Sequence, residues 1–224
     1  WIRGKLTRGL KSKNNTSIWL NQPKRISIVV PTRDMVHSGF AFSLTQLIKT
    51  SENAGIETFL FFNSGSVLLN QREKLVKSSM EVESDYTLWL DSDMTFPSTT
   101  LLRLLSHDKD IVGCNYKKRS NPQTPVAYRE IGNWDSWVSF DEKEDLVKVE
   151  GVGMGCILIK TDLFKEINKP FFEFTYNEET DDWLGEDFNL FTKFRNIGKN
   201  IYIDTNLSRE IGHLGIYKFG SSNQ

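Results

Sequence analysis

The sequence predicts an α/β fold, in which helices flank a mostly parallel central sheet and a small antiparallel patch follows in the second half. The first observation behind this prediction is that short β-branched and apolar runs alternate with stretches of helical apolar spacing before residue 114. Such alternation is typical of a parallel sheet covered on both faces. The second observation is that short apolar runs after residue 125 follow one another with only turns between them, which predicts antiparallel pairing.

Four runs in the first half predict buried strands. The first, Ile26 to Pro31, is apolar and β-branched and follows a basic turn. The second ends in the turn signal Asn63-Ser64-Gly65-Ser66, and the third, YTLWL, is followed at once by Asp91-Ser92-Asp93. We therefore predict strands at 26–31, 57–63, 86–90 and 110–113, and helices at 40–49, 67–80 and 97–105, with Pro97 in the first turn, where proline is favoured.

The second half is predicted to contain shorter elements. A glycine-rich loop, GVGMG at 151–155, leads into an apolar run, and Gly198 closes a stretch of helical spacing. The aromatic and acidic stretch 171–183 is predicted to be a long loop. We predict strands at 126–128, 137–140, 146–149, 156–160 and 200–204, a short helix at 161–167 capped by Thr161, a helix at 186–196, and a last segment at 208–215 that carries His213.

Length, composition and charge exclude several classes of protein. The 224 residues favour one large domain, and 38% hydrophobic with 25% charged residues is typical of a soluble globular protein. A net charge of -1 argues against a nucleic-acid binder held by bulk positive charge, and no apolar run is long enough for a transmembrane segment. Cys114 and Cys156 are too few for a disulfide scaffold, so a reducing, cytoplasmic location is expected.

The near-neutral total hides a basic N-terminal arm. No acid precedes Asp34, whereas eight basic residues do: Arg3, Lys5, Arg8, Lys11, Lys13, Lys24, Arg25 and Arg33. Residues 1–25 are interpreted as an arm outside the folded domain. Two interpretations stay open, a solvated tail and a contact with an anionic surface or partner.

Asp91-Ser92-Asp93 is the central motif of the sequence. Two carboxylates one residue apart, just past a buried strand, can both turn to one hard divalent cation such as Mg²⁺ or Mn²⁺. In parallel sheets ligands bind beyond the carboxyl ends of the strands, which is where this triplet is predicted to lie. The alternative interpretation is a surface turn with an aspartate cap for the next helix.

Four further motifs accompany the triplet in the order Pro31-Thr32-Arg33-Asp34, Gly151–Gly155, Gly185-Glu186-Asp187 and Ile211-Gly212-His213. With this ordered set, the chain from Ile26 to about Leu214 resembles the GT-A fold glycosyltransferases, closest to the family-two-like inverting group. The resemblance implies a single catalytic domain at 26–224. Its nucleotide-sugar-binding half would be 26–113 and its acceptor-binding half 114–224.

The resemblance implies a metal-dependent transfer of a sugar from a nucleotide-sugar donor, most often a UDP-sugar, to an acceptor hydroxyl of a carbohydrate or another molecule. Asp93 would be a direct ligand of Mn²⁺ or Mg²⁺, Asp91 would support it, and His213 would complete the site. Asp187 is the best match to the catalytic base, with Glu186 as its competitor. Such a base is needed because a hydroxyl is a poor nucleophile at neutral pH.

The same resemblance implies the donor contacts. Asn63 and Ser64 stand where many relatives carry acids, so the preference for one nucleobase over another is left open. Glycine at the 151–155 loop would let the backbone approach the donor sugar. The implied donor-binding residues are Pro31, Thr32, Arg33, Asp34, Asn63, Arg72, Asp91, Ser92 and Gly153.

Two other functions remain as alternatives. A nucleotidyltransferase that makes nucleotide sugars usually carries a glycine-rich loop with Arg and Lys directly after its first strand, and Pro31-Thr32-Arg33-Asp34-Met35 lacks that loop. A non-catalytic binder of nucleotides or carbohydrates could keep the fold. Candidates at every metal and base position argue against such a binder.

Overall fold

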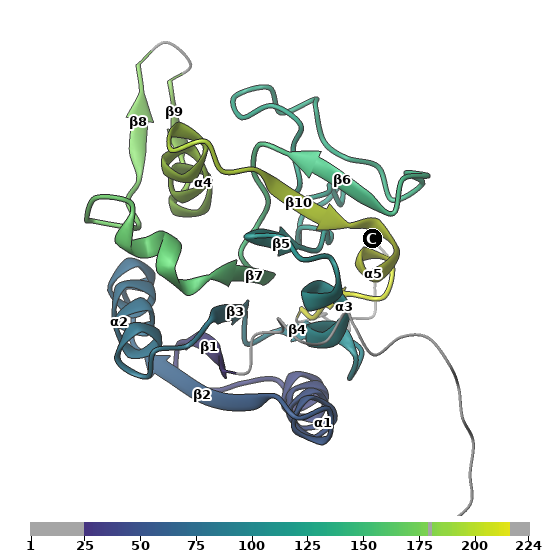
Figure 1. Ribbon diagram of the computed structural model, residues 1–224. Coiled ribbons are helices and arrows are strands. Elements are labelled where there is room, and N and C mark those ends of the chain that lie inside the picture. The colour runs from purple at the N-terminus through teal and green to yellow at the C-terminus, as the bar shows by residue number, and fades with distance from the viewer. Residues whose placement is uncertain (1–24, 179–180, 216–224) are drawn as a thin grey trace, which may run out of the picture.

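The computed structural model describes residues 25–178 and 181–215, and it contains a central sheet of seven strands (Figure 1). Their order is β2-β1-β3-β7-β5-β10-β6. Strands β7 and β6 run opposite to the others, because each makes only antiparallel pairings. The bounds are β1 (Arg25–Thr32), β2 (Glu57–Ser64), β3 (Tyr86–Leu90), β5 (Ile111–Gly113), β6 (Leu146–Val149), β7 (Cys156–Lys160) and β10 (Ile201–Asp204).

Helices cover both faces of this sheet. Figure 1 shows α2 and α4 on one face and α1, α3 and α5 on the other. Strand β1 is buried from Ile26 to Val30, which explains why all of these residues except Ser27 are apolar, since both of its faces are covered. The bounds are α1 (Ser38–Asn53), α2 (Leu68–Glu81), α3 (Thr100–Ser106), the 3₁₀-helix η2 (Thr161–Lys165), α4 (Glu186–Asn196) and α5 (Thr205–Ser208).

Two small antiparallel sheets lie outside the central one. In the first, β4 (Met94–Thr95) pairs with β11 (Gly212–His213). A Cβ atom on Gly212 would lie 2.3 Å from the Thr95 hydroxyl oxygen, so this pairing requires glycine. In the second, β8 (Thr175–Asn177) and β9 (Asp182–Leu184) form a hairpin.

The α/β fold class is confirmed, and every strand predicted in the first half is present. Four predictions in the second half are wrong. The long loop at 171–183 contains the hairpin strands β8 and β9, and the stretches 126–128 and 137–140 make isolated bridges through Tyr128 and Trp137 where strands were expected. The helix predicted at 161–167 is a 3₁₀-helix that ends at Lys165.

The basic arm lies outside the described residues, except for Arg25, which begins β1. None of the helices at 25–178 and 181–215 is both long enough and apolar enough to span a bilayer.

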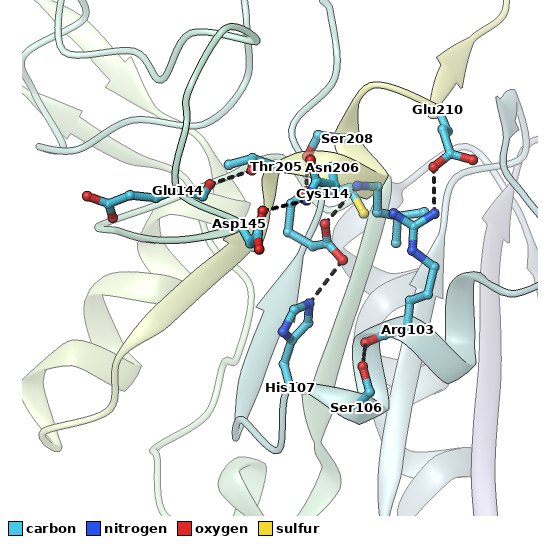
Figure 2. Close-up of polar contacts among 12 residues, drawn as sticks. Arg103, Ser106, His107, Cys114, Glu144, Asp145, Thr205, Asn206, Ser208 and Glu210 are labelled. Carbon is cyan, nitrogen blue, oxygen red and sulfur yellow. Dashed lines mark hydrogen bonds and ion pairs between the residues drawn. The ribbon is translucent and has the colours of Figure 1, made fainter.

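A polar cluster around Asp204 fastens the chain that leads from β10 toward β11. Asp204 is 4% exposed and accepts a hydrogen bond from the Leu207 backbone amide at 2.7 Å, which caps α5. Figure 2 shows His107 reaching from the end of α3 toward this cluster, with its Nε2 atom 3.0 Å from the Asp204 carboxylate. Burial raises the pKa of Asp204, but these two hydrogen bonds outweigh it and hold the pKa below its ordinary value.

Replacing Asp204 with alanine is expected to lower the free energy of unfolding by about 2–3 kcal/mol, because a cap and a buried hydrogen bond are lost together. Since the folded state lowers the pKa of Asp204, this stability is present at neutral pH and is lost as the pH falls through the folded pKa. Urea unfolding at several pH values measures it. Asp145→Ala, at an exposed partner of Asn206, is the control and should change little.

Candidate active site

Three distant segments hold the backbone of Asp91-Ser92-Asp93. The Asp91 amide donates to the Gly155 carbonyl at 3.1 Å, and the Ser92 carbonyl accepts from the His37 amide at 3.2 Å. The Asp93 carbonyl accepts from the Leu214 amide at 2.8 Å, next to the β4–β11 pairing. The glycine loop, the start of α1 and the C-terminal strand therefore converge on the triplet.

A cavity of about 500 Å³ opens at the carboxyl ends of β1 and β3, where the sequence predicted a ligand. The turn after β2 forms another wall, and Gln71 of α2 fixes this turn by donating to the Gly65 carbonyl at 2.7 Å. Eight predicted site residues line the cavity together: Pro31, Thr32, Arg33, Arg72, Asp91, Ser92, Asp93 and His213.

Arg72 is a buried cation at the wall of this cavity. It is 3% exposed, and its guanidinium lies 3.1 Å from the Glu186 carboxylate and 3.7 Å from that of Asp91. Its Nε and Nη1 atoms nevertheless have no hydrogen-bond acceptor among the residues that the structure describes. Nη1 is the atom that pairs with Glu186, so Arg72 is held mainly by charge and neutralises two carboxylates at the wall of the cavity.

Asp93 and His213 form the second charged group of the cavity. The Nε2 atom of His213 lies 3.7 Å from the Asp93 carboxylate. A hydrogen bond of 2.9 Å joins the Nδ1 atom of the same ring to the Lys117 carbonyl. Arg119 approaches the same carboxylate to 3.0 Å. Burial raises the pKa of Asp93, but the nearby His213 ring and the charge of Arg119 outweigh it, so the pKa lies below its ordinary value. The nearby Asp93 carboxylate in turn raises the pKa of His213.

The donor chemistry of Asp93 and His213 fits a divalent cation. A hydrogen bond from Nδ1 to a backbone carbonyl fixes the tautomer of a metal-binding histidine and leaves Nε2 free to bind. Within residues 25–178 and 181–215, no three His, Cys, Asp or Glu side chains are close enough to hold a metal together. The Asp91 carboxylate is paired with the guanidinium of Arg72 and not with Asp93 and His213. A cation here would take its remaining ligands from water or a phosphate group, which is usual for Mg²⁺.

Glu186 and Asp187 begin α4 beside Arg72. Glu186 is 9% exposed and is paired with the guanidinium, whereas Asp187 is partly buried and makes no ion pair among the described residues. Burial, together with the neighbouring Glu186 charge, raises the pKa of Asp187 to about 6 against the opposing effect of Arg72. A carboxylate tuned in this way is suited to accept a proton near neutral pH.

Three predicted donor-binding residues do not line the cavity: Asp34, Asn63 and Gly153. Gly153 has another physical reason to be glycine, because a Cβ atom there would lie 2.4 Å from the Tyr116 hydroxyl oxygen. Tyr116 is buried, and its hydroxyl accepts from the Gly155 amide at 3.0 Å. The glycine loop therefore packs around this ring, which contacts the ring of His213 edge to face at 5.4 Å.

The structure adds residues that the sequence did not single out. Arg119 lies on a loop far from Asp93 in the sequence, and no local signal marks it. Asn189, 8% exposed in α4, donates through its side-chain amide to the carbonyls of Glu173 at 2.9 Å and Leu184 at 3.0 Å. A buried amide inside an amphipathic helix is a usable signal, since such a group must find partners.

Together these features define an α/β protein with a ligand cavity at the carboxyl edge of its sheet. No protein-family model and no curated protein match the chain. Among solved structures, A197 from STIV is similar with a TM-score of 0.53 and 19% identity, covering 80% of this chain and 81% of that one. This likeness shows a shared fold.

Two other solved structures are less similar. A mutant of Drosophila beta-1,4-galactosyltransferase 7, in complex with manganese, UDP-Gal and xylobiose, has a TM-score of 0.48 and 14% identity over 86% of this chain and 71% of its own. A glycosyltransferase involved in the glycosylation of the major capsid of PBCV-1 has a TM-score of 0.37 and 12% identity, over 63% and 62%.

Proposed function

We propose that this protein is a glycosyltransferase that moves a sugar from a nucleoside-diphosphate donor to an acceptor hydroxyl. The observation that carries the proposal is the cavity that brings Arg72, His213 and the Asp91-Ser92-Asp93 triplet together. A diphosphate offers oxygens that the guanidinium of Arg72 can bind. The ordered motifs that resemble the GT-A enzymes support the same conclusion.

The donor would lie with its diphosphate between Arg72 and the Asp93–His213 pair, and with its nucleoside toward Thr32 and Arg33. Asp93 and His213 would hold Mn²⁺ or Mg²⁺, which neutralises the charge that develops on the diphosphate as it leaves. Arg119 would move from the Asp93 carboxylate to the phosphate oxygens when the cation binds. After this move, the Asp93 carboxylate would be paired with the metal ion and the Arg119 guanidinium with the phosphate.

Asp187 would act as the general base. The acceptor oxygen forms a bond to the anomeric carbon, the bond from that carbon to the diphosphate oxygen breaks, and the hydroxyl proton passes to the Asp187 carboxylate. Glu186 is less suited to this role, because Arg72 holds it in an ion pair. Inversion at the anomeric carbon is proposed from the resemblance to the inverting group.

A thermal-shift panel tests the donor assignment. UDP, GDP and ADP, alone and with Mn²⁺, are added to the full chain, and at least one nucleotide is expected to raise the melting temperature only when the metal is present. A ligand at a hundred times its dissociation constant adds about 2.7 kcal/mol of stability. Asp93→Asn should abolish the metal dependence, whereas Asp162→Asn, at an exposed acid on η2, should keep it.

The absence of a metal-dependent shift with any nucleotide would contradict the proposal. Nucleotide binding without hydrolysis or transfer would instead favour a non-catalytic binder. Release of pyrophosphate from a sugar phosphate and a nucleoside triphosphate would favour a nucleotidyltransferase.

A further inference from the structure

A second hollow of about 600 Å³ lies between the β8–β9 hairpin and the loop that carries Trp134. We call it the aromatic groove and define it by Trp134, Tyr176, Asn177, Glu178, Asp182 and Trp183, all of which line it. Figure 1 shows the hairpin standing out from the body of the protein beside α4. None of these residues lines the cavity around Arg72, so the groove is a separate site.

Three large aromatic side chains of the groove are open to solvent. Trp183 is 61% exposed, Tyr176 43% and Trp134 40%. The rings of Tyr176 and Trp183 are held 5.2 Å apart across the hairpin, so they form one preformed apolar surface. A cluster of exposed aromatic rings with a polar rim is typical of a binding surface.

The ring of Trp134 is also fixed from behind. It packs edge to face against Tyr128 at 5.1 Å and against Phe188 at 5.5 Å. A Cβ atom on Gly151 would lie 2.5 Å from the Phe188 ring, so the glycine loop supports this stack. Both walls of the groove are therefore ordered before any ligand arrives, which lowers the entropic cost of binding.

We propose that the aromatic groove binds the acceptor, and that the acceptor is a neutral carbohydrate chain. This inference rests on the glycosyltransferase function proposed above. A pyranose ring has an apolar C–H face that can lie on an indole, and a rim of hydroxyls that can donate to carboxylate and amide oxygens. Trp183 and Trp134 supply the apolar faces, while Asn177, Glu178 and Asp182 supply the acceptors. Two acids at the rim disfavour an anionic glycan by charge repulsion.

The groove lies close to the proposed base along the chain. Leu184 lines the groove and lies three residues before Asp187, a stretch that spans at most about 10 Å. Phe188, which supports Trp134, is the residue after Asp187. The Asn189 amide holds the end of β9 against α4 through the carbonyls of Leu184 and Gly185. In this proposal, a glycan lying in the groove would present one terminal hydroxyl at the Asp187 carboxylate.

The test measures glycan binding without relying on transfer. Maltotriose, cellotriose and chitotriose serve as neutral probes and trigalacturonate as the anionic one, each titrated into the full chain by calorimetry. At least one neutral trisaccharide is expected to bind, and trigalacturonate is expected to bind more weakly. Trp183→Ala should weaken the neutral probe about tenfold, because one stacking face is lost. Trp183→Phe should retain most of the affinity, since it keeps an aromatic face.

Phe42→Ala is the matched control, because Phe42 is an aromatic residue of α1 that is 69% exposed and lies outside the groove. It should leave glycan affinity unchanged. The inference is overturned if no neutral probe binds, if Trp183→Ala binds as well as the parent chain, or if trigalacturonate binds more tightly.

The two proposals can fail separately. A metal-dependent nucleotide shift without glycan binding would retain the donor site and remove the acceptor groove. Trp183-dependent glycan binding without any nucleotide shift would retain the groove as a carbohydrate site and remove the glycosyltransferase function.

Discussion

Replacing Asp187 with asparagine is expected to lower the rate of sugar transfer by about 10²–10⁴-fold, because the variant has no carboxylate to accept the proton of the acceptor hydroxyl. Metal-dependent nucleotide binding should remain, since Asp187 does not line the cavity around Arg72. Transfer of a labelled sugar and nucleotide thermal shifts measure the two properties. Full activity of this variant would remove Asp187 from the role of base.

The same substitution is expected to stabilise the fold at alkaline pH. The folded state raises the pKa of Asp187 from 3.8 to about 6, so it holds the proton more tightly than the unfolded chain does. Ionisation therefore destabilises the parent protein progressively as the pH rises between these values. A shift of about two units corresponds to at most about 3 kcal/mol, and the partial exposure of Asp187 lowers this figure.

Unfolding experiments should thus find the asparagine variant more stable than the parent at about pH 8 and equal to it at about pH 3, below both pKa values of Asp187. Asp162→Asn, at an exposed acid, is the control and should show no such pH dependence. In the parent protein, kcat/KM should fall as the pH drops below about 6, as the base becomes protonated. A gain in stability without any loss of transfer would mean that the Asp187 carboxylate affects the stability of the fold but is not the base.

The strands of the first half could be predicted because each is a short run dominated by β-branched, aromatic or other apolar residues. Ile26 to Val30 are covered on both sides, so every position except Ser27 is apolar, and the run is visible without a structural template. The triplet Asp91-Ser92-Asp93 could be placed at the sheet edge for the same reason, since it directly follows the buried end of YTLWL. Both predictions depend on local sequence alone.

The strand pairings that complete the structure around the site could not be predicted from local sequence in this way. Strands β4 and β11 have two residues each, which is too short to show any period, and the need for glycine at 212 is visible only once Thr95 is known to lie opposite. The hairpin of β8 and β9 was missed because its outer residues are exposed and its position depends on Asn189, a contact from the following helix. Pairings between distant segments and side-chain contacts decide these features.

The predicted metal site illustrates the difference between what local sequence predicts and what contacts between distant side chains decide. The sequence placed Asp91, Asp93 and His213 in one ligand set, and the structure does bring all three to one cavity. The side chains divide between two partners within it, because the buried guanidinium of Arg72 attracts Asp91 while His213 lies nearer to Asp93. No spacing rule could indicate this division, since it depends on a helix residue that a pattern would place at the surface.

Replacing Arg72 with methionine is expected to have the largest effect on stability, with a loss of about 3–5 kcal/mol. The substitution keeps much of the packed volume but leaves the carboxylates of Glu186 and Asp91 without their buried cation. Domains of this kind have about 5–15 kcal/mol of stability in total, so the variant should still fold at low temperature. Thermal unfolding of the full chain measures the loss.

Two further variants separate the charge of Arg72 from its geometry. Adding Glu186→Gln to Arg72→Met should recover part of the lost stability, because one of the unpaired acids is removed. Arg72→Lys keeps the charge, so most of the stability should remain. A single ammonium cannot form the planar fork of donors that a diphosphate accepts, so nucleotide affinity should still fall by about tenfold or more. Unchanged nucleotide affinity in Arg72→Lys would mean that the guanidinium does not bind the nucleotide-sugar donor, and that Arg72 serves only to neutralise its two acids.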